Sequence, residues 1–397
     1  MNKRCAVFLA GALTAAALCC IGCTDLGDRP QHKPGDRYSF EGVSFRIETV
    51  AADLTVPWAL AWLPDGRMLI TERPGVVRVQ ARPGQTEVLA RIDEVDQSGE
   101  GGLMGVAVSP DFSRDGWIYL AYTARDGRRQ LKNMVVRYRL DAGRLVERTV
   151  LLDNLPARTY HNGLPLAFGP DGKLYASTGD AGKGQLAQEM ESLAGKFVRL
   201  NADGTVPADN PFPAQAGQER FGINSRQSAI WTLGHRNCQG LDWNSRGQMF
   251  ATEHGPSGID GGSGLDEVNL IERGGNYGWP LHRGGDKAED FVAPIKYWGE
   301  PAIAPSGATF YRGETKKWKD WFFFCTLRGQ SLFAMRFDPD QPQKVLRVER
   351  LLEDQFGRLR AAAMGPDGHL YLTTSNRDGR GRPGPNDDRV LRLVPME

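Results

Sequence analysis

The sequence has no excess of charge of either sign. Its 49 lysines and arginines balance 48 aspartates and glutamates. A protein that binds the phosphate backbone of a nucleic acid needs clustered positive charge to displace the counterions of the phosphates. The balance therefore argues against nucleic acid as a partner. Any anion-binding site has to come from cationic side chains that converge locally.

Cysteine is scarce in the body of the chain. Six cysteines are present, but four precede residue 24, which leaves only Cys238 and Cys325. Two cysteines are too few for a disulfide framework or a thiolate metal site. A single Cys238–Cys325 disulfide in an oxidising compartment is left open.

Long apolar runs are also lacking. The apolar stretch at 6–18 follows Lys3 and Arg4 and is shorter than the roughly 20 residues that span a bilayer. This pattern predicts an export signal. Cys20-Ile21-Gly22-Cys23 resembles a bacterial lipobox, so residues 1–23 are expected to be a lipoprotein signal peptide with Cys23 as the lipid anchor. An ordinary cleaved signal peptide is the alternative. Either way the protein is expected to be exported, and to be periplasmic or lipid-anchored to the cell envelope.

Long helical periodicity is almost absent, and a strand motif repeats instead. Each copy has an apolar strand end, a turn that usually reads Asp-Gly, and an alternating strand. Asp-Gly supplies the positive φ angles of a tight hairpin. About six copies predict an all-β fold and a six-bladed β-propeller, with an array of β-sandwiches as the alternative. The copies surround Asp65-Gly66, Asp115-Gly116, Asp171-Gly172, Arg246-Gly247 and Asp367-Gly368, with a degenerate one at Trp321-Phe322-Phe323-Phe324.

The two ends of the body are expected to close the ring. Residues 43–50 and 389–394 both alternate apolar and polar positions, and pairing them in one blade would remove an exposed sheet edge. Residues 24–44 contain Pro, Gly and charged residues with little apolar content, which predicts a tether. The domain organisation is then a signal peptide at 1–23, a tether at 24–44 and a propeller at 45–397.

One histidine stands at the entrance of a repeated strand without being part of the repeat. His161 precedes the third copy of the motif, and Asp180 lies at the end of the same hairpin. A carboxylate there could bind one ring nitrogen and leave the other free to accept a proton. The alternative is a structural histidine and an ordinary turn aspartate.

Cationic residues also occur at the ends of strands, where a propeller would bring them to one channel. Arg236 offers a fork of donors suited to carboxylates, and Arg328 follows an aromatic strand. Arg358 and Arg360 share one strand face, which is costly unless an anion lies between them. These residues suggest an anionic ligand with several carboxylates, although exposed arginines are common. The carbonyls of Gly255 and Pro256 are hard oxygen ligands suited to calcium.

Taken together, the ordered motifs resemble a known family. The chain is similar to the soluble quinoprotein glucose and sorbosone dehydrogenases, in particular the bacterial aldose sugar dehydrogenases. The matching stretches are Gly99-Glu100-Gly101-Gly102-Leu103-Met104-Gly105, His161-Asn162-Gly163, Ser192-Leu193-Ala194-Gly195-Lys196, Gly234-His235-Arg236-Asn237, Glu253-His254-Gly255-Pro256, Gly275-Asn276-Tyr277-Gly278-Trp279-Pro280 and Gly357-Arg358-Leu359-Arg360.

The resemblance implies a six-bladed propeller that binds calcium and pyrroloquinoline quinone (PQQ), a planar tricarboxylate. It further implies that the protein oxidises an aldose sugar at the anomeric carbon to the lactone. Hydride would pass to the quinone with His161 as general base and Asp180 as its orienting carboxylate, and an external acceptor would take the electrons. The residues it assigns are Arg236, Asn237, Arg328, Arg358 and Arg360 to the cofactor, Glu100 and Trp298 to the substrate, and Gly255 and Pro256 to calcium.

The chain departs from the family pattern at three places. Leu164-Pro165 replaces Gly-Arg after His161, and proline removes a backbone donor and fixes φ. Glu100 stands where the family has glutamine, and Arg328 where it has lysine. These departures favour the alternative of a non-catalytic propeller that binds a sugar or a protein. A calcium-dependent lactone hydrolase is a third interpretation.

Overall fold

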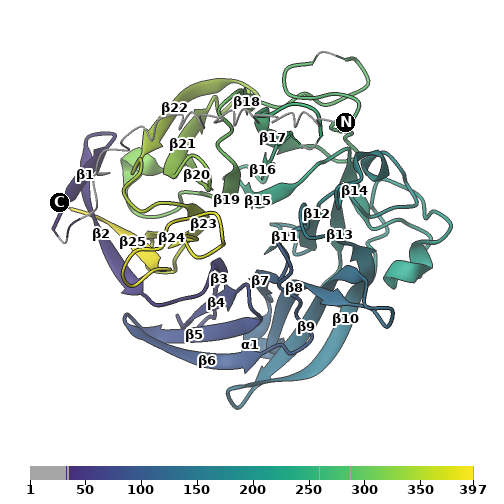
Figure 1. The fold of residues 1–397 in the computed structure, drawn as a ribbon, viewed down its shortest axis with the longest axis horizontal. Helices are drawn as coiled ribbons and strands as arrows, with labels where there is room; N and C mark the ends of the chain where they lie inside the picture. Colours follow the sequence, from purple (N-terminus) through teal and green to yellow (C-terminus); the bar gives the residue numbers. More distant parts are fainter. Residues whose placement is uncertain (1–32, 34, 259, 287, 397) are drawn as a thin grey trace, which may run out of the picture.

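The computed structural model describes residues 33, 35–258, 260–286 and 288–396. Over these residues the chain forms six antiparallel sheets arranged around a central axis, a six-bladed β-propeller (Figure 1). The fold class predicted from the repeated motif is therefore confirmed. The predicted signal peptide and its Cys23 anchor lie outside the described residues.

Five blades have four strands each, and the last has five. The first blade comprises β3 (Pro57–Trp62), β4 (Met68–Glu72), β5 (Val76–Arg82) and β6 (Gln85–Arg91). The second comprises β7 (Leu103–Val108), β8 (Trp117–Arg125), β9 (Leu131–Asp141) and β10 (Arg144–Pro156). The third comprises β11 (Gly163–Phe168), β12 (Leu174–Thr178), β13 (Lys196–Leu200) and β14 (Ile230–Leu233).

The fourth blade comprises β15 (Cys238–Trp243), β16 (Met249–Glu253), β17 (Asp266–Ile271) and β18 (Lys296–Trp298). The fifth comprises β19 (Pro305–Phe310), β20 (Phe322–Thr326), β21 (Ser331–Phe337) and β22 (Val345–Leu351). The sixth comprises β23 (Leu359–Met364), β24 (Leu370–Thr374), β25 (Val390–Pro395), β2 (Val43–Ala51) and β1 (Arg37–Phe40). The short helices are α1 (Phe112–Asp115), η1 (Gly184–Ala187), η2 (Gln218–Phe221) and η3 (Lys316–Trp318).

The repeated turn joins the first and second strands of five blades. Its glycine has a φ angle between 68° and 86° in every copy, at Gly66, Gly116, Gly172, Gly247 and Gly368. That region is open to glycine at little cost. In the fifth blade, where the motif is degenerate, β19 and β20 are joined by a longer connection that contains η3.

The first strands pack against one another around the axis, and each carries a register shift near its beginning. In β11 this bulge falls between Gly163 and Leu166, so it contains Leu164 and Pro165. A residue in a bulge need not donate to the ladder. The proline that follows His161 is therefore accommodated by an irregularity that all six blades share.

The ring closes as the terminal segments predict. β2 pairs with β25, with Ile47 opposite Leu393, and Figure 1 shows these purple and yellow strands side by side. The predicted tether is wrong at its C-terminal end, because β1 adds a fifth strand to this blade. Phe40 is buried against Trp318 and Trp321, which anchors a segment that is otherwise polar.

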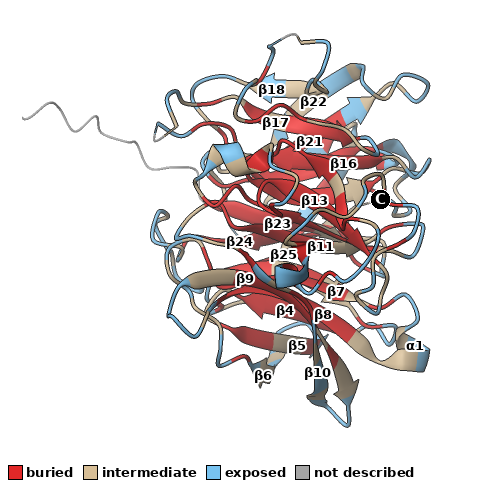
Figure 2. Cartoon of the chain, turned by 90° about the vertical axis from the view of Figure 1, so that its right-hand side faces the viewer, coloured by how far each residue is buried: buried red, intermediate tan, exposed pale blue. Residues whose placement is uncertain are grey.

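Buried apolar side chains fill the spaces within and between the blades. Figure 2 shows the buried strands in the interior and the exposed residues in peripheral loops. Cys238 and Cys325 are buried and free, so the Cys238–Cys325 disulfide that the sequence left open is not formed. Within the described residues, the structure has no helix with the length and apolarity needed to span a bilayer.

Candidate active site

The predicted pair of His161 and Asp180 is present. His161 lies just before β11 and Asp180 just after β12, so neighbouring strands of one blade hold the two side chains. The imidazole Nδ1 is 2.8 Å from Asp180 Oδ1. Both residues are buried, with exposed fractions of 5% and 1%. A neutral His161 that donates from Nδ1 to this carboxylate keeps Nε2 as a proton acceptor.

Further donors hold Asp180 in place. The amide of Gly182 donates to Oδ1 at 2.7 Å, and the indole Nε1 of Trp279 donates to Oδ2 at 2.9 Å. The backbone amide of Asp180 donates to the carbonyl of Arg236 at 2.8 Å. The carboxylate thus accepts hydrogen bonds from the third blade and from the loop after β17.

The backbone around this pair leaves room only for glycine at one position. His161 has a φ of 56°, and its carbonyl accepts the amide of Ala181. A Cβ at Gly179 would overlap the His161 carbonyl oxygen. The Gly179-Asp180 sequence therefore allows the two strand ends to approach closely enough for the side chains to meet.

A cavity of about 220 Å³ opens beside this pair. Asn162 and Gly163, which directly follow His161, form part of its wall. A second cavity, of about 260 Å³, runs along the first strands of the blades and shares three of the residues in the wall. The charged and aromatic residues of the first cavity are Arg73, Arg360, Arg380, Glu100, Asp378, His254 and Trp58.

Glu100 links His161 to the opposite wall. Its Oε2 accepts the backbone amide of His161 at 3.1 Å, and its Oε1 lies 2.7 Å from Nη1 of Arg380. Burial by itself would raise the pKa of Glu100, but Arg380 and the His161 amide outweigh it and hold the pKa below its usual value. The negative charge that this glutamate brings to the site is therefore neutralised within the chain.

Arg358 and Arg360 have an internal anion between them. Asp378 Oδ2 lies 2.8 Å from Nε of Arg358 and 3.9 Å from Nη2 of Arg360. Burial lowers the pKa of Arg360 to about 10, and Asp378 offsets part of that shift. The guanidinium of Arg360 lies 5.8 Å from the ring centre of Trp58. The spacing of the arginines predicted an anionic ligand between them, and the structure instead places Asp378, from the loop after β24, next to both guanidinium groups.

Arg236 and Asn237 lie between β14 and β15. The guanidinium of Arg236 forms an ion pair with Asp260, donates to Ser257 Oγ at 3.0 Å and lies over Trp279 at 5.5 Å. Asn237 Oδ1 accepts the amide of Gly163 at 3.1 Å. Its Nδ2 is buried and has no hydrogen-bond partner in the described part of the chain. Both residues thus contact segments that form the site.

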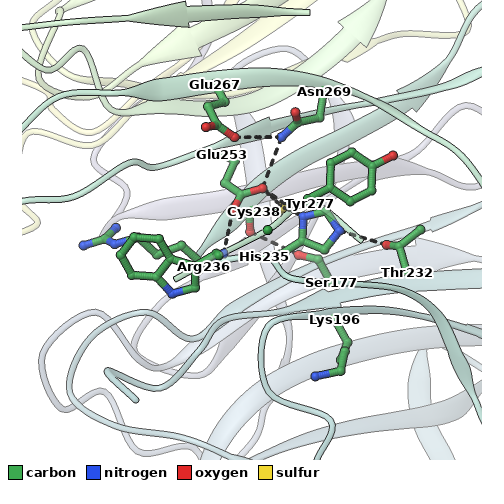
Figure 3. Close-up of polar contacts among 12 residues, drawn as sticks. Ser177, Lys196, Thr232, His235, Arg236, Cys238, Glu253, Glu267, Asn269 and Tyr277 are labelled. Carbon is green, nitrogen blue, oxygen red and sulfur yellow. Dashed lines mark hydrogen bonds and ion pairs between the residues drawn. The ribbon is translucent and has the colours of Figure 1, made fainter. Parts of the chain in front are cut away.

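A buried carboxylate fixes the backbone of Arg236 (Figure 3). Glu253 accepts the amide of Arg236 through Oε1, and through Oε2 it accepts Nδ1 of His235 at 2.9 Å and Nδ2 of Asn269 at 3.2 Å. Because the carbonyl of Arg236 accepts the amide of Asp180, this network also supports the backbone at Asp180.

The same network contains a group of potential metal ligands. Atoms of His235, Cys238 and Glu253 lie within 4.8 Å of one another. His235 Nε2, however, is 2.8 Å from Thr232 Oγ1, its Nδ1 bonds to Glu253, and the Cys238 thiol donates to Glu253 at 3.2 Å. Protein hydrogen bonds therefore already use all three groups.

Two predicted residues lie elsewhere. Arg328 is exposed after β20, and its neighbour Leu327 forms part of the cavity wall in its place. Trp298 packs in β18 against Phe324 and Phe333, with ring centres 5.6 and 5.7 Å apart. The structure therefore corrects the placement of Trp298 at the substrate, because its ring completes the core of blades four and five.

Sequence reasoning missed several residues of the cavity. Trp58 is the second residue of β3 in blade one, and Arg73 directly follows β4. The rule that strand ends converge on the channel would have found both. Asp378 and Arg380 belong to a loop without a strand pattern, so no local signal pointed to them.

Comparison with known proteins places this geometry in context. A family model described as Glucose / Sorbosone dehydrogenase matches residues 54–384. The aldose sugar dehydrogenase YliI of Escherichia coli is 32% identical over 355 residues, which cover 84% of this chain and 91% of that protein. The quinoprotein glucose dehydrogenase B of Acinetobacter calcoaceticus is 27% identical over 425 residues, which cover 83% and 85% of the two chains. The PQQ-bound structure of an aldose sugar dehydrogenase from Streptomyces coelicolor is 33% identical, with a TM-score of 0.76, and the match covers 89% of this chain and 98% of that one.

Proposed function

The chain belongs to the glucose/sorbosone dehydrogenase family of oxidoreductases, and from this premise we propose that it oxidises an aldose sugar at the anomeric carbon to the lactone, with PQQ and calcium as cofactors. The observation that carries the proposal is the buried His161–Asp180 pair at the edge of a cavity rich in arginine. The imidazole of His161 would be the proton acceptor, and the arginines of the cavity would bind a ligand with several negative charges.

The residues of the cavity fit a planar tricarboxylate. Guanidinium groups suit carboxylates, and Trp58 offers an aromatic surface. His254 Nε2 and Asn237 Nδ2 are buried without hydrogen-bond partners among the described residues. Buried polar atoms of this kind are expected where a bound ligand supplies the missing hydrogen bond. When bound, PQQ would supply the two-electron acceptor. The residues proposed to hold it are Arg236, Asn237, Arg358 and Arg360, and Arg328 is left out because it is exposed.

His161 is proposed to remove the proton of the anomeric hydroxyl through Nε2. Asp180 holds the ring in the required tautomer and stabilises the imidazolium that forms. General-base catalysis of this kind contributes about 10²–10⁴-fold to the rate. Trp279 and Gly182 keep the carboxylate from turning away.

Calcium is proposed to bind at the backbone carbonyls of Gly255 and Pro256, which follow β16. Both residues are buried. The neighbouring carboxylates are already engaged: Asp260 pairs with Arg236, and Asp266 accepts the amides of Gly255, Ile303 and Ala304. This chain would therefore contribute carbonyl oxygens to the ion, which are ligands that calcium accepts.

The N-terminal pattern supports an exported protein, and an external acceptor would take up the electrons. The same pattern makes Cys23 the proposed point of contact with a membrane.

Addition of calcium and PQQ to the purified apo-protein, followed by dye reduction with several aldoses, tests the proposal. Saturation by one quinone per chain and aldose-dependent turnover are expected. If the protein takes up no quinone and turns over no sugar, it is better explained as a binding propeller. The exposed position of Arg328 is the observation that favours that alternative.

A further inference from the structure

Arg73 is a cation in the wall of the cavity that the proposed mechanism does not use. It directly follows β4 and lines the cavity of about 220 Å³ together with Arg360 and Arg380. It therefore faces the same space as Arg360 and Arg380 of the neighbouring sixth blade.

The other arginines at the site are paired with carboxylates. Arg358 and Arg360 share Asp378, Arg380 pairs with Glu100, and Arg236 pairs with Asp260. For Arg73 the described residues provide no ion pair within 4.0 Å.

One nitrogen of the Arg73 guanidinium also lacks a hydrogen bond within the described residues. Its Nε is buried and has no hydrogen-bond partner in the part of the chain that the structure describes. Burial lowers its pKa, and the more distant Asp378 and Glu100 offset this only in part. A partly buried cation without a nearby counter-ion is less favourable in the apo-protein than a paired one.

The chain nevertheless holds Arg73 in place. Its carbonyl accepts the amide of Leu103 at 2.9 Å. Gly102 packs directly on its side chain, and a Cβ there would overlap Arg73 Cγ. The side chain is thus prepositioned at the cavity wall with its charge unpaired, as a binding site for an anion requires.

We propose that Arg73 binds a carboxylate of the ligand that occupies this cavity. The inference rests on the proposed function, in which that ligand is PQQ. It adds an anchor from the first blade to those proposed in the sixth blade and in the segment between the third and fourth blades.

The first test is quinone binding without sugar or turnover. Apo-protein is titrated with PQQ, and quenching of tryptophan fluorescence reports the Kd. Arg73→Met is expected to raise the Kd about ten- to hundredfold, as for loss of a hydrogen bond to a charged group. Arg73→Lys should keep part of the affinity. Arg82→Met, at an exposed arginine in β5 of the same blade, is the matched control and should bind as the wild type does.

The second test separates ligand binding from a structural role. Because the variant removes an unpaired charge, ligand-free Arg73→Met should melt at the same temperature as the wild type or higher. A marked loss of stability in both Arg73→Met and Arg73→Lys would contradict the inference.

A third titration separates failure of the inference from failure of the proposed function. If the wild type binds PQQ and Arg73→Met binds it equally well, the inference is wrong and the proposed function stands. If the wild type takes up no PQQ, the proposed function fails, and benzene-1,3,5-tricarboxylate replaces the quinone as probe. Binding of that anion that depends on Arg73 would support the inference, and its absence would overturn it.

Discussion

Replacement of Asp180 by asparagine changes the active pair with almost no change in shape. Three donors converge on the carboxylate: His161 Nδ1 and the Gly182 amide at Oδ1, and Trp279 Nε1 at Oδ2. An amide has one oxygen and one NH₂ group, so in either orientation its NH₂ group faces a donor. If the NH₂ faces His161, the ring must accept at Nδ1 and carry its proton on Nε2, where the base is needed.

The expected loss of kcat/KM in Asp180→Asn follows from these contacts. In both orientations the imidazolium loses the negative charge of its partner, and because a hydrogen bond to a charged group is worth about 1.5–3 kcal/mol, we expect a minimum loss of about tenfold in kcat/KM. Inversion of the tautomer would remove most of the general-base contribution of about 10²–10⁴. We therefore expect kcat/KM to fall by at least about tenfold and by at most about 10⁴-fold.

The assay is the initial rate of dye reduction by quinone-loaded protein over a range of aldose concentrations. Quinone uptake by Asp180→Asn should be close to that of the wild type, because Asp180 does not line the cavity. Asp171→Asn, in the turn of the same blade, is the control: it weakens bonds to Tyr175 and Arg199 and should affect stability more than kcat/KM. Activity of Asp180→Asn within a factor of about two of the wild type would refute the assigned role of the pair.

Three further predictions concern buried groups near the site. Lys196→Met should lower the free energy of unfolding by about 3 kcal/mol or more, because Nζ donates to three backbone carbonyls at 2.9 Å; a loss below about 1 kcal/mol in urea titrations would contradict this. Burial, reinforced by Glu253, raises the pKa of Glu267 from 4.5 to about 8. Between these pH values the folded state therefore binds more protons than the unfolded chain, and the free energy of unfolding should fall as the pH rises, by at most about 1.4 kcal/mol per pH unit. Glu267→Gln should flatten that dependence in melting curves, and an unchanged slope would show that Glu267 is ionised throughout. Gly179→Ala should abolish activity or folding because its Cβ would overlap the His161 carbonyl, whereas Gly127→Ala, where nothing lies within 4 Å, should be tolerated; an active Gly179→Ala would contradict the close approach.

The fold was predictable because its signals are local. The Asp-Gly turns mark the first hairpin of most blades, and the alternating segments at 43–50 and 389–394 pair as expected. The strand at Arg37–Phe40 was missed because only its aromatic residues are apolar. Its stability comes from contacts with Trp318 and Trp321 in another blade, which sequence pattern does not show.

Spacing along the chain connects the residues of the site only where they share a hairpin. Asp180 follows from His161 because the two flank neighbouring strands. Trp279 is 99 positions away from Asp180, and Arg380 is 280 positions away from Glu100, so no spacing connects them. The resemblance suggested Arg328, and no matching motif supported Trp298. Neither gave the direction of the side chain, which depends on packing around each strand end.

The most direct test is a single turnover of quinone-loaded protein. Wild type and His161→Gln are each loaded with PQQ, mixed with an aldose, and followed by the absorbance of the bound quinone. The account predicts equal quinone uptake, rapid reduction in the wild type, and reduction slowed by about 10²–10⁴-fold in His161→Gln. Reduction at the same rate in both proteins would show that the imidazole is not the base.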